Sequence, residues 1–364
     1  MSFIVRPARR DDLGDLLDLA KQFTLLNLPA DKTLLAKKIE LSQSSFAGEL
    51  SRAEAEYLLV VEDLEDQRVA GTSSIIAKSG TPNSPNFSFK VLKRERFSKE
   101  LGVGFIHQIL RLHENTDGPT EVGGLVIDKS YRGRPEKLGR LISLARFIYI
   151  GMYTERFEDQ LHAEMAPPLT DEGRSEFWEA LGRRFTGMPY KEADAISQQN
   201  NKFIKSLFPE EDIYLCLLDS KARLVLGRVG EETQAALHLL NSLGFRYKDE
   251  VDPFDGGPHL GVATKEVSLI KQGRYFVPKP KSQASGKAEM DFLGSALVGL
   301  CREEDFRCIV SSFKLSGDDL YLPEISWSSL GLEPGEEVFF SPLAIKGKSI
   351  QRNTKRKEVD HGAV

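Results

Sequence analysis

The sequence predicts a mixed α/β protein in which a twisted sheet is flanked by helices. Short segments rich in β-branched residues alternate with helical segments that carry one apolar stripe, and this alternation is typical of that class. The 364 residues suggest two or three domains, because a single core rarely grows that large. Hydrophobic residues make up 40% of the chain and charged residues 28%, a balance that excludes wholesale disorder, collagen and coiled coil.

The N-terminal segment predicts a strand, two helices and a β-hairpin. The strand covers 2–6, and a first helix covers 11–23 because its apolar residues recur at helical spacing. Asp31 begins a second helical pattern. Residues 57–63 and 69–78 have the length and β-branched content of strands and flank a short turn, so we expect them to pair.

The middle of the chain predicts a strand, a basic loop and a long helix. A loop with two prolines precedes an extended region at 87–92, and 120–128 is again a strand. Residues 129–138 are polar and rich in arginine and lysine. The helix that follows covers 139–153, and a strand at 160–165 comes next.

Three further helices and a tight loop are expected before the C-terminal part. The helices cover 175–184, which carries Trp178, then 193–207, and 233–243, which stops at Gly244. We expect Trp178 to pack in the core rather than touch a ligand. The tight loop is Phe254–Pro258, with the sequence FDGGP.

A compositional break divides the chain near its C-terminal end. Pro278–Lys287 combines proline, serine, glycine and lysine, as a linker or long excursion does. We therefore expect a first domain at 1–207 and a second α/β unit at 208–277 that completes the active site. A small β-rich C-terminal domain at 289–350, with strands at 306–313 and 336–340, and a disordered tail at 351–364 complete this division.

Charge and cysteine content limit the cellular compartments and the kinds of partner that are expected. The formal charge of −5 lacks the basic excess of a nucleic-acid binder, so no nucleic-acid partner is expected. Cys216, Cys301 and Cys308 form no disulfide framework and no zinc motif, which indicates a reducing compartment. No apolar run has the length of a signal peptide or membrane span. We expect a cytoplasmic protein without a membrane partner.

The loop before the long helix is a candidate anion site. Backbone N–H groups at a helix N-terminus attract phosphate, and several cationic side chains would add to that attraction. The alternative is an ordinary connection between strand and helix with a solvated basic loop. The cationic side chains are Arg132, Arg134, Lys137 and Arg140.

Glu164 is the most informative acidic residue because it lies in an apolar strand. An unpaired buried carboxylate is costly, so this side chain is either paired or lies at the edge of a pocket. It could pair with Arg183 or Arg184, anchor a cationic substrate, or accept a proton through water. Asp255 is the second candidate, since the FDGGP loop fixes it in place.

Three histidines are weaker candidates. His162 and His238 are each interpreted as packed or surface histidines rather than catalysts. His259 follows the FDGGP loop directly and is a somewhat better candidate for a functional role.

A string of motifs resembles the arginine N-succinyltransferase family. The segment AEM…DEGRSEFWEALGRRFTGMPYKEAD at Ala163–Asp194 is similar to that family's signature. Shorter matches are LPA at 28–30, GEL at 48–50, GFRY at 244–247 and FDGGP at 254–258. Their order and spacing agree with the family from residue 2 to about 275.

This resemblance implies a GNAT-like fold and transfer of a succinyl group from succinyl-CoA to the α-amino group of L-arginine. Succinyl-CoA is then the co-substrate, and neither a metal nor a prosthetic group is expected. Leu125 matches the leucine that the family assigns to succinyl-CoA binding, so we expect Leu125, Val126 and Ile127 to bind the CoA arm. Glu164 and Asp255 become the candidate catalytic acids.

The basic loop resembles the R-x-x-G-x-G/A pyrophosphate loop of GNAT-type N-acyltransferases. Arg132 and Gly139 match it, with a longer segment between them, and we expect Arg132, Arg134 and Gly139 to hold the CoA phosphates.

One position departs from the family pattern. The family's proton-donor histidine follows a V-I-G-x-V segment, whereas Gly230 follows the corresponding VLGRV here. Two alternatives therefore remain open: a non-catalytic paralogue that binds acyl-CoA or arginine, and an N-acyltransferase with a different amine acceptor. Whether the chain forms homo- or hetero-oligomers is also open.

Overall fold

The N-terminal elements follow the predicted pattern. The computed structural model describes residues 3–22, 28–197, 202–283 and 292–345. The Asp31 carboxylate accepts a 2.8 Å hydrogen bond from the Leu34 backbone and caps the second helix, which confirms that start. The predicted end of the first helix, Phe23, lies outside the described residues. The elements are β1 (Phe3–Pro7), α1 (Leu13–Lys21), α2 (Lys32–Phe46), β2 (Glu56–Asp63) and β3 (Arg68–Ile76).

Alternation along β2 sets the two layers of helices. Leu58 and Val60 pack with residues of α1 and α2 on one face of the sheet. Leu59 and Val61 pack on the other face with α3 (Leu138–Met152). Successive strand residues point to opposite faces, so a strand with consecutive apolar residues, as at Tyr57–Val61 here, requires cover on both. The predicted hairpin is confirmed, since β2 pairs antiparallel with β3.

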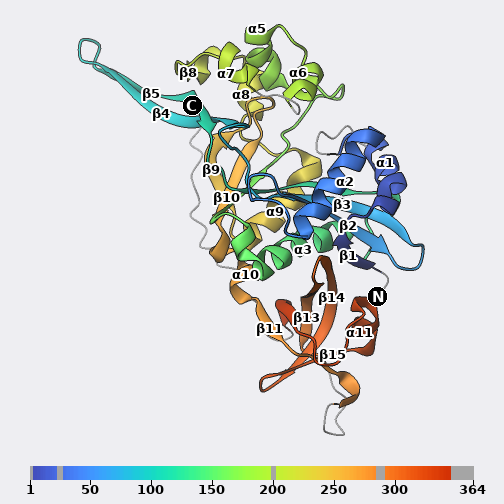
Figure 1. The fold of residues 1–364 in the computed structure, drawn as a ribbon. Coiled ribbons are helices and arrows are strands. Elements are labelled where there is room, and N and C mark those ends of the chain that lie inside the picture. Colours follow the sequence, from blue (N-terminus) through green and yellow to red (C-terminus); the bar gives the residue numbers. More distant parts are fainter. Residues whose placement is uncertain (1–2, 23–27, 198–201, 284–291, 346–364) are drawn as a thin grey trace.

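A long hairpin extends well beyond the predicted strand at 87–92. Its strands are β4 (Asn86–Ser98) and β5 (Val103–Asn115), which pair antiparallel along their whole length. Figure 1 shows this hairpin projecting from the body at the upper left. The outer half of β4 reads KRERFS and lacks β-branched residues. Cross-strand pairing with β5, rather than local propensity, therefore holds it extended.

The predicted strand, basic loop, helix and strand are all present. β6 (Thr120–Ile127) leads into α3, and β7 (Gln160–Glu164) follows it. β6 and β7 run parallel, as strands joined by a crossover helix do. α3 is buried along most of its length, which explains its nearly continuous apolar sequence.

An upper lobe of short helices follows β7, and the single helix predicted at 175–184 is wrong. The chain leaves helical geometry at Leu181, with φ −126° and ψ −74°. Glycine is required at the next position, because a Cβ at Gly182 would lie 2.2 Å from the Trp178 ring. In the predicted helix at 193–207, residues 198–201 lie outside the described part. The elements are α4 (Glu176–Ala180), α5 (Gly182–Thr186), α6 (Tyr190–Ser197), α7 (Phe203–Leu207), β8 (Ile213–Tyr214) and α8 (Ser220–Val225).

Two strands of the predicted second unit enter the same sheet as the first. α9 (Gln234–Leu243) ends at Gly244, whose φ of 114° confirms the predicted stop. β9 (Arg246–Val251) and β10 (Pro258–Ala263) were not predicted, and β10 pairs antiparallel with β7. β9 in turn pairs with β4, so these strands join the body to the long hairpin. The boundary at 207 stays a prediction.

The C-terminal part is β-rich, as expected. Its strand β13 was not predicted, whereas β14 and β16 correspond to the predicted strands. Residues 284–287 of the predicted linker lie outside the described residues, as do 288–291 and the predicted tail. The elements are α10 (Ser268–Gln272), β11 (Arg274–Phe276), β12 (Lys279–Pro280), β13 (Gly294–Arg302), β14 (Asp305–Ser316), β15 (Asp319–Leu322), α11 (Glu324–Leu330) and β16 (Val338–Ile345).

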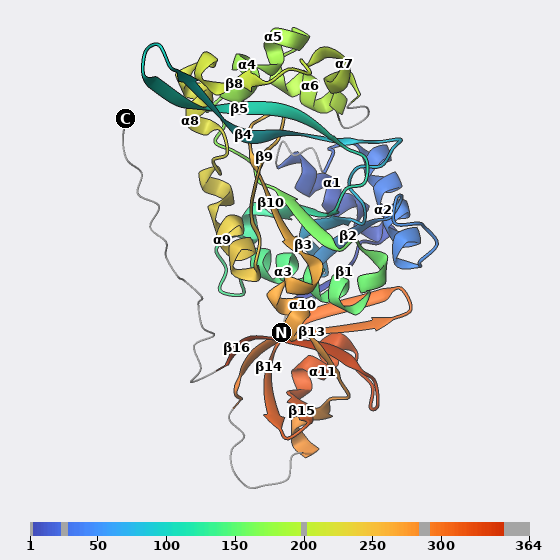
Figure 2. The same cartoon turned by 90° about the vertical axis from the view of Figure 1, so that its left-hand side faces the viewer.

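All three parts share one sheet. β14 pairs with β1 at Val5 and Cys308, which carries the sheet from the body into the C-terminal part. Figure 2 shows these strands below the body and the upper lobe above it. Among the described residues, no helix combines the length and apolar composition needed to cross a bilayer. The strand order is β11-β16-β13-β14-β1-β2-β3-β6-β7-β10-β9-β4-β5-β8.

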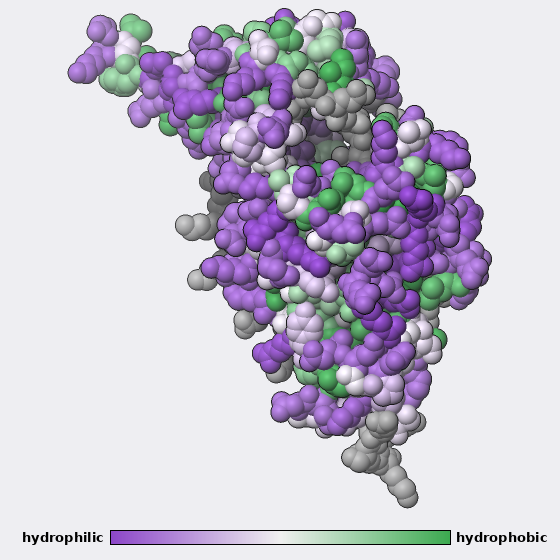
Figure 3. All heavy atoms as spheres, viewed as in Figure 1, coloured by the Kyte–Doolittle hydropathy of each residue, from purple (hydrophilic) through white to green (hydrophobic). Residues whose placement is uncertain are grey.

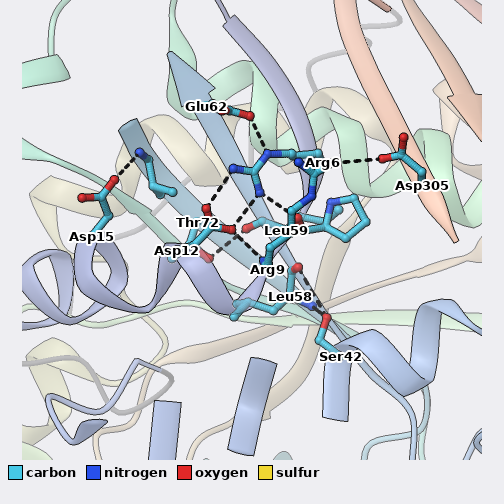
Figure 4. Close-up of polar contacts among 12 residues, drawn as sticks. Arg6, Arg9, Asp12, Asp15, Ser42, Leu58, Leu59, Glu62, Thr72 and Asp305 are labelled. Carbon is cyan, nitrogen blue, oxygen red and sulfur yellow. Dashed lines mark hydrogen bonds and ion pairs between the residues drawn. The ribbon is translucent and has the colours of Figure 1, made fainter. Parts of the chain in front are cut away.

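A buried ion network stabilises the start of the chain (Figure 4). The Arg6 guanidinium contacts the Asp12 carboxylate at 2.7 Å and Glu62 at 2.5 Å. Two carboxylates thus neutralise one buried cation, as a buried charge requires. Arg9 reaches Asp305 at 3.3 Å and so adds a polar contact between the body and the C-terminal part.

Candidate active site

The sheet opens between β6 and β7. The two strands pair only at Thr120 with Leu161 and at Glu121 with His162. Beyond this point β6 stays paired with β3, and β7 stays paired with β10. The edge of β6 that follows Glu121 therefore has no strand partner on the β7 side, and its backbone groups face an opening in the sheet.

A bulge shapes this edge of β6. Thr72 faces Val126 and Ser74 faces Gly123, so two residues of β6 oppose one residue of β3. One of them is Gly124, with a φ of +60°, and a Cβ there would lie 2.5 Å from the Ser74 hydroxyl. Glycine is required at this position by both its conformation and its space. The bulge redirects the backbone next to the opening.

Polar side chains gather on one face of the strands beside the opening. Leu161, Ala163 and Leu260 point into the core under α3. The alternate residues of the same strands therefore point to the opposite face. These residues, with their neighbours on β6 and β9, are Glu121, His162, Glu164, His259 and Glu250.

Glu164 is held as an anion at the end of β7. Its Oε1 lies 3.3 Å from His162 Nε2 and 3.7 Å from His259 Nε2, while the side chain is still 35% exposed. Desolvation opposes its ionisation, but the hydrogen bond with His162 and the charge of His259 outweigh it and lower the pKa of Glu164 to about 2. The Glu164 carboxylate is thus both ionised and accessible from solvent.

The expected alternative of a pairing with Arg183 or Arg184 is wrong. Arg183 contacts Glu179 at 2.7 Å, and Arg184 contacts Asp219 at 2.9 Å. Both pairs belong to the upper lobe.

His259 is enclosed by acidic groups. Its side chain is 2% exposed, and Nδ1 lies 3.9 Å from the Glu250 carboxylate. Burial disfavours the cation, but Glu250, Glu164 and Asp252 outweigh burial and raise the pKa of His259. Burial lowers the pKa of His162, whose ring meets that of His259 edge to face at 4.7 Å.

The surrounding carboxyl groups are too buried and too close to one another to ionise together. Burial and the charge of Glu164 raise the pKa of Glu121 to about 8, and its carboxylate accepts a hydrogen bond from Ser79. Burial and Glu164 likewise raise the pKa of Asp252 to about 6. Glu164 is therefore ionised, while Glu121 and Asp252 stay partly protonated, which limits the repulsion between these carboxyl groups.

Asp255 lies within electrostatic reach of Glu164. Burial and the charge of Asp252 raise the pKa of Asp255, with a smaller contribution from Glu164. Its Oδ1 accepts a 2.8 Å hydrogen bond from the Gly257 backbone and so shapes the FDGGP loop. Trp178 is fully buried and stacks on Phe254 of that loop, which confirms its expected packing role.

The expected CoA-arm residues lie on the open edge of β6. Val126 is buried against the α1 side, while Leu125 and Ile127 are partly buried against the α3 core. Their side chains therefore support the strand, and their backbone borders the opening.

The basic loop is less uniform than expected. Arg132 folds back so that its Nε donates a 3.2 Å hydrogen bond to the Ile127 carbonyl. Arg134 stacks on Tyr131 at 4.1 Å and lies 3.9 Å from Asp63. Gly139 lies in the first turn of α3, where the helix N-terminus follows Lys137. The loop thus brings Arg132 and Gly139 to the end of β6, whereas Arg134 is directed toward Asp63.

Gly230 borders the end of β7. Its backbone N–H donates a 2.9 Å hydrogen bond to the Ala166 carbonyl, two residues beyond Glu164. A Cβ at this position would lie 2.9 Å from the Pro167 carbonyl oxygen. Any side chain at Gly230 would therefore require a small shift of this turn.

His162 and His259 are the functional candidates that the sequence-based prediction undervalued. Together with Glu164 they offer three donor atoms within 4.8 Å of one another. Donors bound to one zinc ion lie about 3–3.5 Å apart, and the contacts present here already satisfy the charge of Glu164. The expectation that no metal takes part stays a prediction. The available signal was spacing, since His162 and Glu164 share a strand face at i and i+2.

Comparison with known proteins gives one consistent family. A family model described as arginine N-succinyltransferase beta subunit matches residues 3–269. An arginine N-succinyltransferase from Yersinia enterocolitica is 34% identical over 338 residues, which are 92% of this chain and 96% of that protein. An arginine N-succinyltransferase subunit beta from Pseudomonas aeruginosa is 32% identical, over 94% of this chain and 98% of its own.

A solved structure agrees with this family and with the expected fold class. It is that of arginine/ornithine succinyltransferase subunit AI from Pseudomonas aeruginosa, with a TM-score of 0.81 and 26% identity. The match covers 94% of this chain and 99% of that chain. The likeness therefore extends through the C-terminal part, where the motifs were sparse. In sequence and in fold, this chain belongs to the arginine N-succinyltransferase family.

Proposed function

We propose that this chain transfers a succinyl group from succinyl-CoA to the α-amino group of L-arginine, giving N2-succinyl-L-arginine and CoA. Membership of the family supports the reaction class. The observation that carries the proposal for this chain is the ionised, accessible Glu164 carboxylate beside the open edge of β6. An anion there suits an α-ammonium group, and the open edge suits an acyl-CoA arm.

The CoA arm lies along β6 in this proposal. Backbone N–H groups between Val122 and Ile127 that face the opening can donate to the pantetheine amides and to the thioester carbonyl. The phosphates lie at the other end, where Arg132, Gly139 and the start of α3 meet. Arg134 joins them by turning away from Asp63, a buried carboxylate that lies 3.9 Å from it.

The acceptor amino acid occupies the acidic side of the opening. Glu164 holds its ammonium group, and Asp255 receives the guanidinium. The positive charge of the guanidinium offsets the burial and the Asp252 charge that raise the pKa of Asp255 in the free protein. Arginine carries a permanent cation, and a buried cation needs an anionic partner. The free amine attacks the thioester carbonyl, and the CoA sulfur departs.

Ornithine is the second candidate acceptor. The Pseudomonas aeruginosa structure carries both arginine and ornithine in its name. A cluster of carboxylates holds any side-chain cation, so this site alone does not exclude the shorter amine. A non-catalytic paralogue is less well supported, since the relatives are named as enzymes and the acidic site is intact here.

The test is a thiol-release assay on the purified chain with a panel of substrates. Succinyl-CoA and acetyl-CoA are each offered with arginine, ornithine, lysine and no amine, and the product is identified by mass spectrometry. We expect CoA release with succinyl-CoA and arginine, together with N2-succinylarginine. Binding of acyl-CoA without thiol release for any amine would establish the non-catalytic alternative instead.

Assembly into an oligomer is a further part of the proposal. The Pseudomonas aeruginosa relatives are named as subunits. The tip of the β4–β5 hairpin exposes apolar side chains, visible as green residues at the upper left of Figure 3. We propose that this surface contacts another subunit, either a second copy of the chain or a different chain. Light scattering of the purified chain distinguishes them, since a dimer indicates a second copy and a monomer indicates a different chain. The exposed residues are Phe97, Leu101, Val103, Phe105 and Ile106.

The expected cytoplasmic location also belongs to the proposal. The three cysteines are all free in the structure. They indicate a reducing compartment, and the proposed location follows from this.

A further inference from the structure

His259 holds an unusual position in the acidic site. It is the direct cross-strand neighbour of Glu164, and its ring is almost fully enclosed. Among the described residues, its Nε2 has no hydrogen-bond partner, although the atom is buried. A buried polar atom without a partner costs free energy, so this nitrogen is available to form a hydrogen bond with a group of the substrate.

Glu250 favours one tautomer of the His259 ring. Its carboxylate lies 3.9 Å from Nδ1, too far for a direct hydrogen bond, but its negative charge on that side of the ring favours a proton on Nδ1. The lone pair of the neutral ring then lies on Nε2, directed to the same side as the Glu164 carboxylate at 3.7 Å. This is the arrangement of a carboxylate, an imidazole and a free lone pair that activates nucleophiles.

The gap between His259 Nε2 and Glu164 Oε1 fits an ammonium group. The 3.7 Å between them is too long for a direct hydrogen bond. An ammonium nitrogen about 2.8 Å from each atom can donate one hydrogen to each. We propose that His259 is the general base that takes the proton of the acceptor's α-ammonium group through Nε2, while Glu164 anchors that group and Glu250 positions the ring.

This assignment rests on the proposed succinyl transfer and adds a residue to it. His162 does not take the same role, because its Nε2 already lies 3.3 Å from Glu164. Its Nδ1 is buried without a partner among the described residues, as His259 Nε2 is, but burial lowers the pKa of His162 and makes it the weaker base. It orients Glu164 instead.

The charges around His259 favour its taking up a proton. The groups facing it are Glu250 and Lys248 of β9, Glu164 and His162 of β7, Asp252 after β9, and Glu121 of β6. Burial alone would lower the pKa of His259, but its acidic neighbours raise it. A raised pKa makes the imidazole a stronger proton acceptor.

Two protons leave the α-ammonium nitrogen in each turnover. The α-ammonium group gives its first proton to His259 Nε2, and the neutral amine attacks the thioester carbonyl carbon. The nitrogen loses a second proton as the C–S bond breaks, and this proton neutralises the departing CoA thiolate. His259 then releases the first proton to solvent, so each turnover yields an amide, CoA–SH and one proton.

The experiment compares pH profiles of kcat/KM for arginine. In the wild type, activity should rise with pH through the apparent pKa of His259. His259→Gln should lose at least about 10²-fold at neutral pH. Its remaining activity should keep rising until the amine itself deprotonates, so the loss should shrink in alkali. The KM for succinyl-CoA should stay the same.

Two further variants separate a base from a structural residue. Glu250→Gln removes the anion at Nδ1, so the acidic limb of the profile should move to lower pH while activity in alkali is retained. His238→Gln on the exposed face of α9 is the matched control and should leave the profile unchanged. A folded His259→Gln enzyme with near-normal activity, or with the wild-type acidic limb, would overturn the assignment.

A second measurement stands apart from turnover. Nitrogen NMR of the histidine side chains, with His259→Gln used for assignment, should show the Nδ1–H tautomer in alkali. Arginine should shift the Nε2 signal. An Nε2–H tautomer would overturn the proposal even in an active enzyme. The expected tautomer in a chain that never releases CoA would overturn the proposed function alone.

Discussion

Glu164 and His259 face each other across β7 and β10, and their Oε1 and Nε2 atoms lie 3.7 Å apart. β10 begins directly after the FDGGP loop, nearly one hundred residues after β7. Antiparallel pairing of these strands therefore creates the acidic site from segments that are distant in the sequence. The open edge of β6 on the other side of β7 completes it.

Glu164→Gln tests the anchor of the ammonium group. The change keeps size and removes charge, so we expect kcat/KM for arginine to fall at least about 10²-fold. The melting temperature should change little, because Arg183 and Arg184 pair elsewhere. Steady-state kinetics and thermal melts measure both. Glu179→Gln, which breaks the contact with Arg183, is the control for loss of a carboxylate, and near-normal turnover of folded Glu164→Gln would reject the anchor.

Asp255→Asn tests the guanidinium partner. Asparagine retains the acceptor for the Gly257 N–H, so the loop should persist. Loss of a charge-assisted bond worth about 1.5–3 kcal/mol should raise the KM for arginine about tenfold or more and affect kcat less. Asp249→Asn, at an exposed position on β9, is the matched control. Equal effects on arginine and on an uncharged amine would contradict a role in binding the guanidinium.

Charge reversal at Arg132 and Arg134 tests the phosphate end of the CoA site. Each phosphate contact is worth about 1.5–3 kcal/mol, so the double variant should raise the KM for succinyl-CoA at least tenfold. Arginine binding should stay nearly unchanged. Since Arg134 also contacts Asp63, the single Arg132→Glu variant separates the two contributions. Arg223→Glu on α8 controls for net charge, and an unchanged KM for succinyl-CoA would exclude this loop.

Stability should depend on pH through Glu121. Folding raises the pKa of this carboxyl from 4.5 to about 8, so the folded state holds a proton that the unfolded state releases. The contribution of this proton to the free energy of unfolding is complete below about pH 4.5 and is lost as the pH rises toward 8. Glu121→Gln retains a neutral partner for Ser79 and should gain melting temperature over the wild type at pH 9 but not at pH 5. A difference independent of pH would show that Glu121 stays ionised.

Limited proteolysis tests the division near the C-terminal part. We expect the first cut within Pro278–Lys287, because a segment rich in serine, glycine and lysine is in general cleaved more readily than paired strands are. The fragments are identified by mass spectrometry. An initial cut inside Ala163–Arg184 would show that the upper lobe opens before this segment.

The sequence by itself determined the local elements and the family. Apolar periodicity located α1, α2, α3 and α9, and β-branched content located β2, β3 and β6, because these signals come from neighbouring residues. The motif string around SEFWEALGRRF identified the family for the same reason. Glu164 stood out because a carboxylate in an apolar strand needs an explanation.

Only the tertiary structure decided which residues act together. β9 and β10 carry too little local signal to be recognised, since pairing with β7 and β4 rather than propensity makes them strands. His259 therefore appeared as an isolated histidine until that pairing placed it opposite Glu164. The need for glycine at position 182, where the predicted helix is interrupted, likewise depends on the position of the Trp178 ring. Burial and charge change a pKa only through neighbours in space, so the site's chemistry is fixed by the fold.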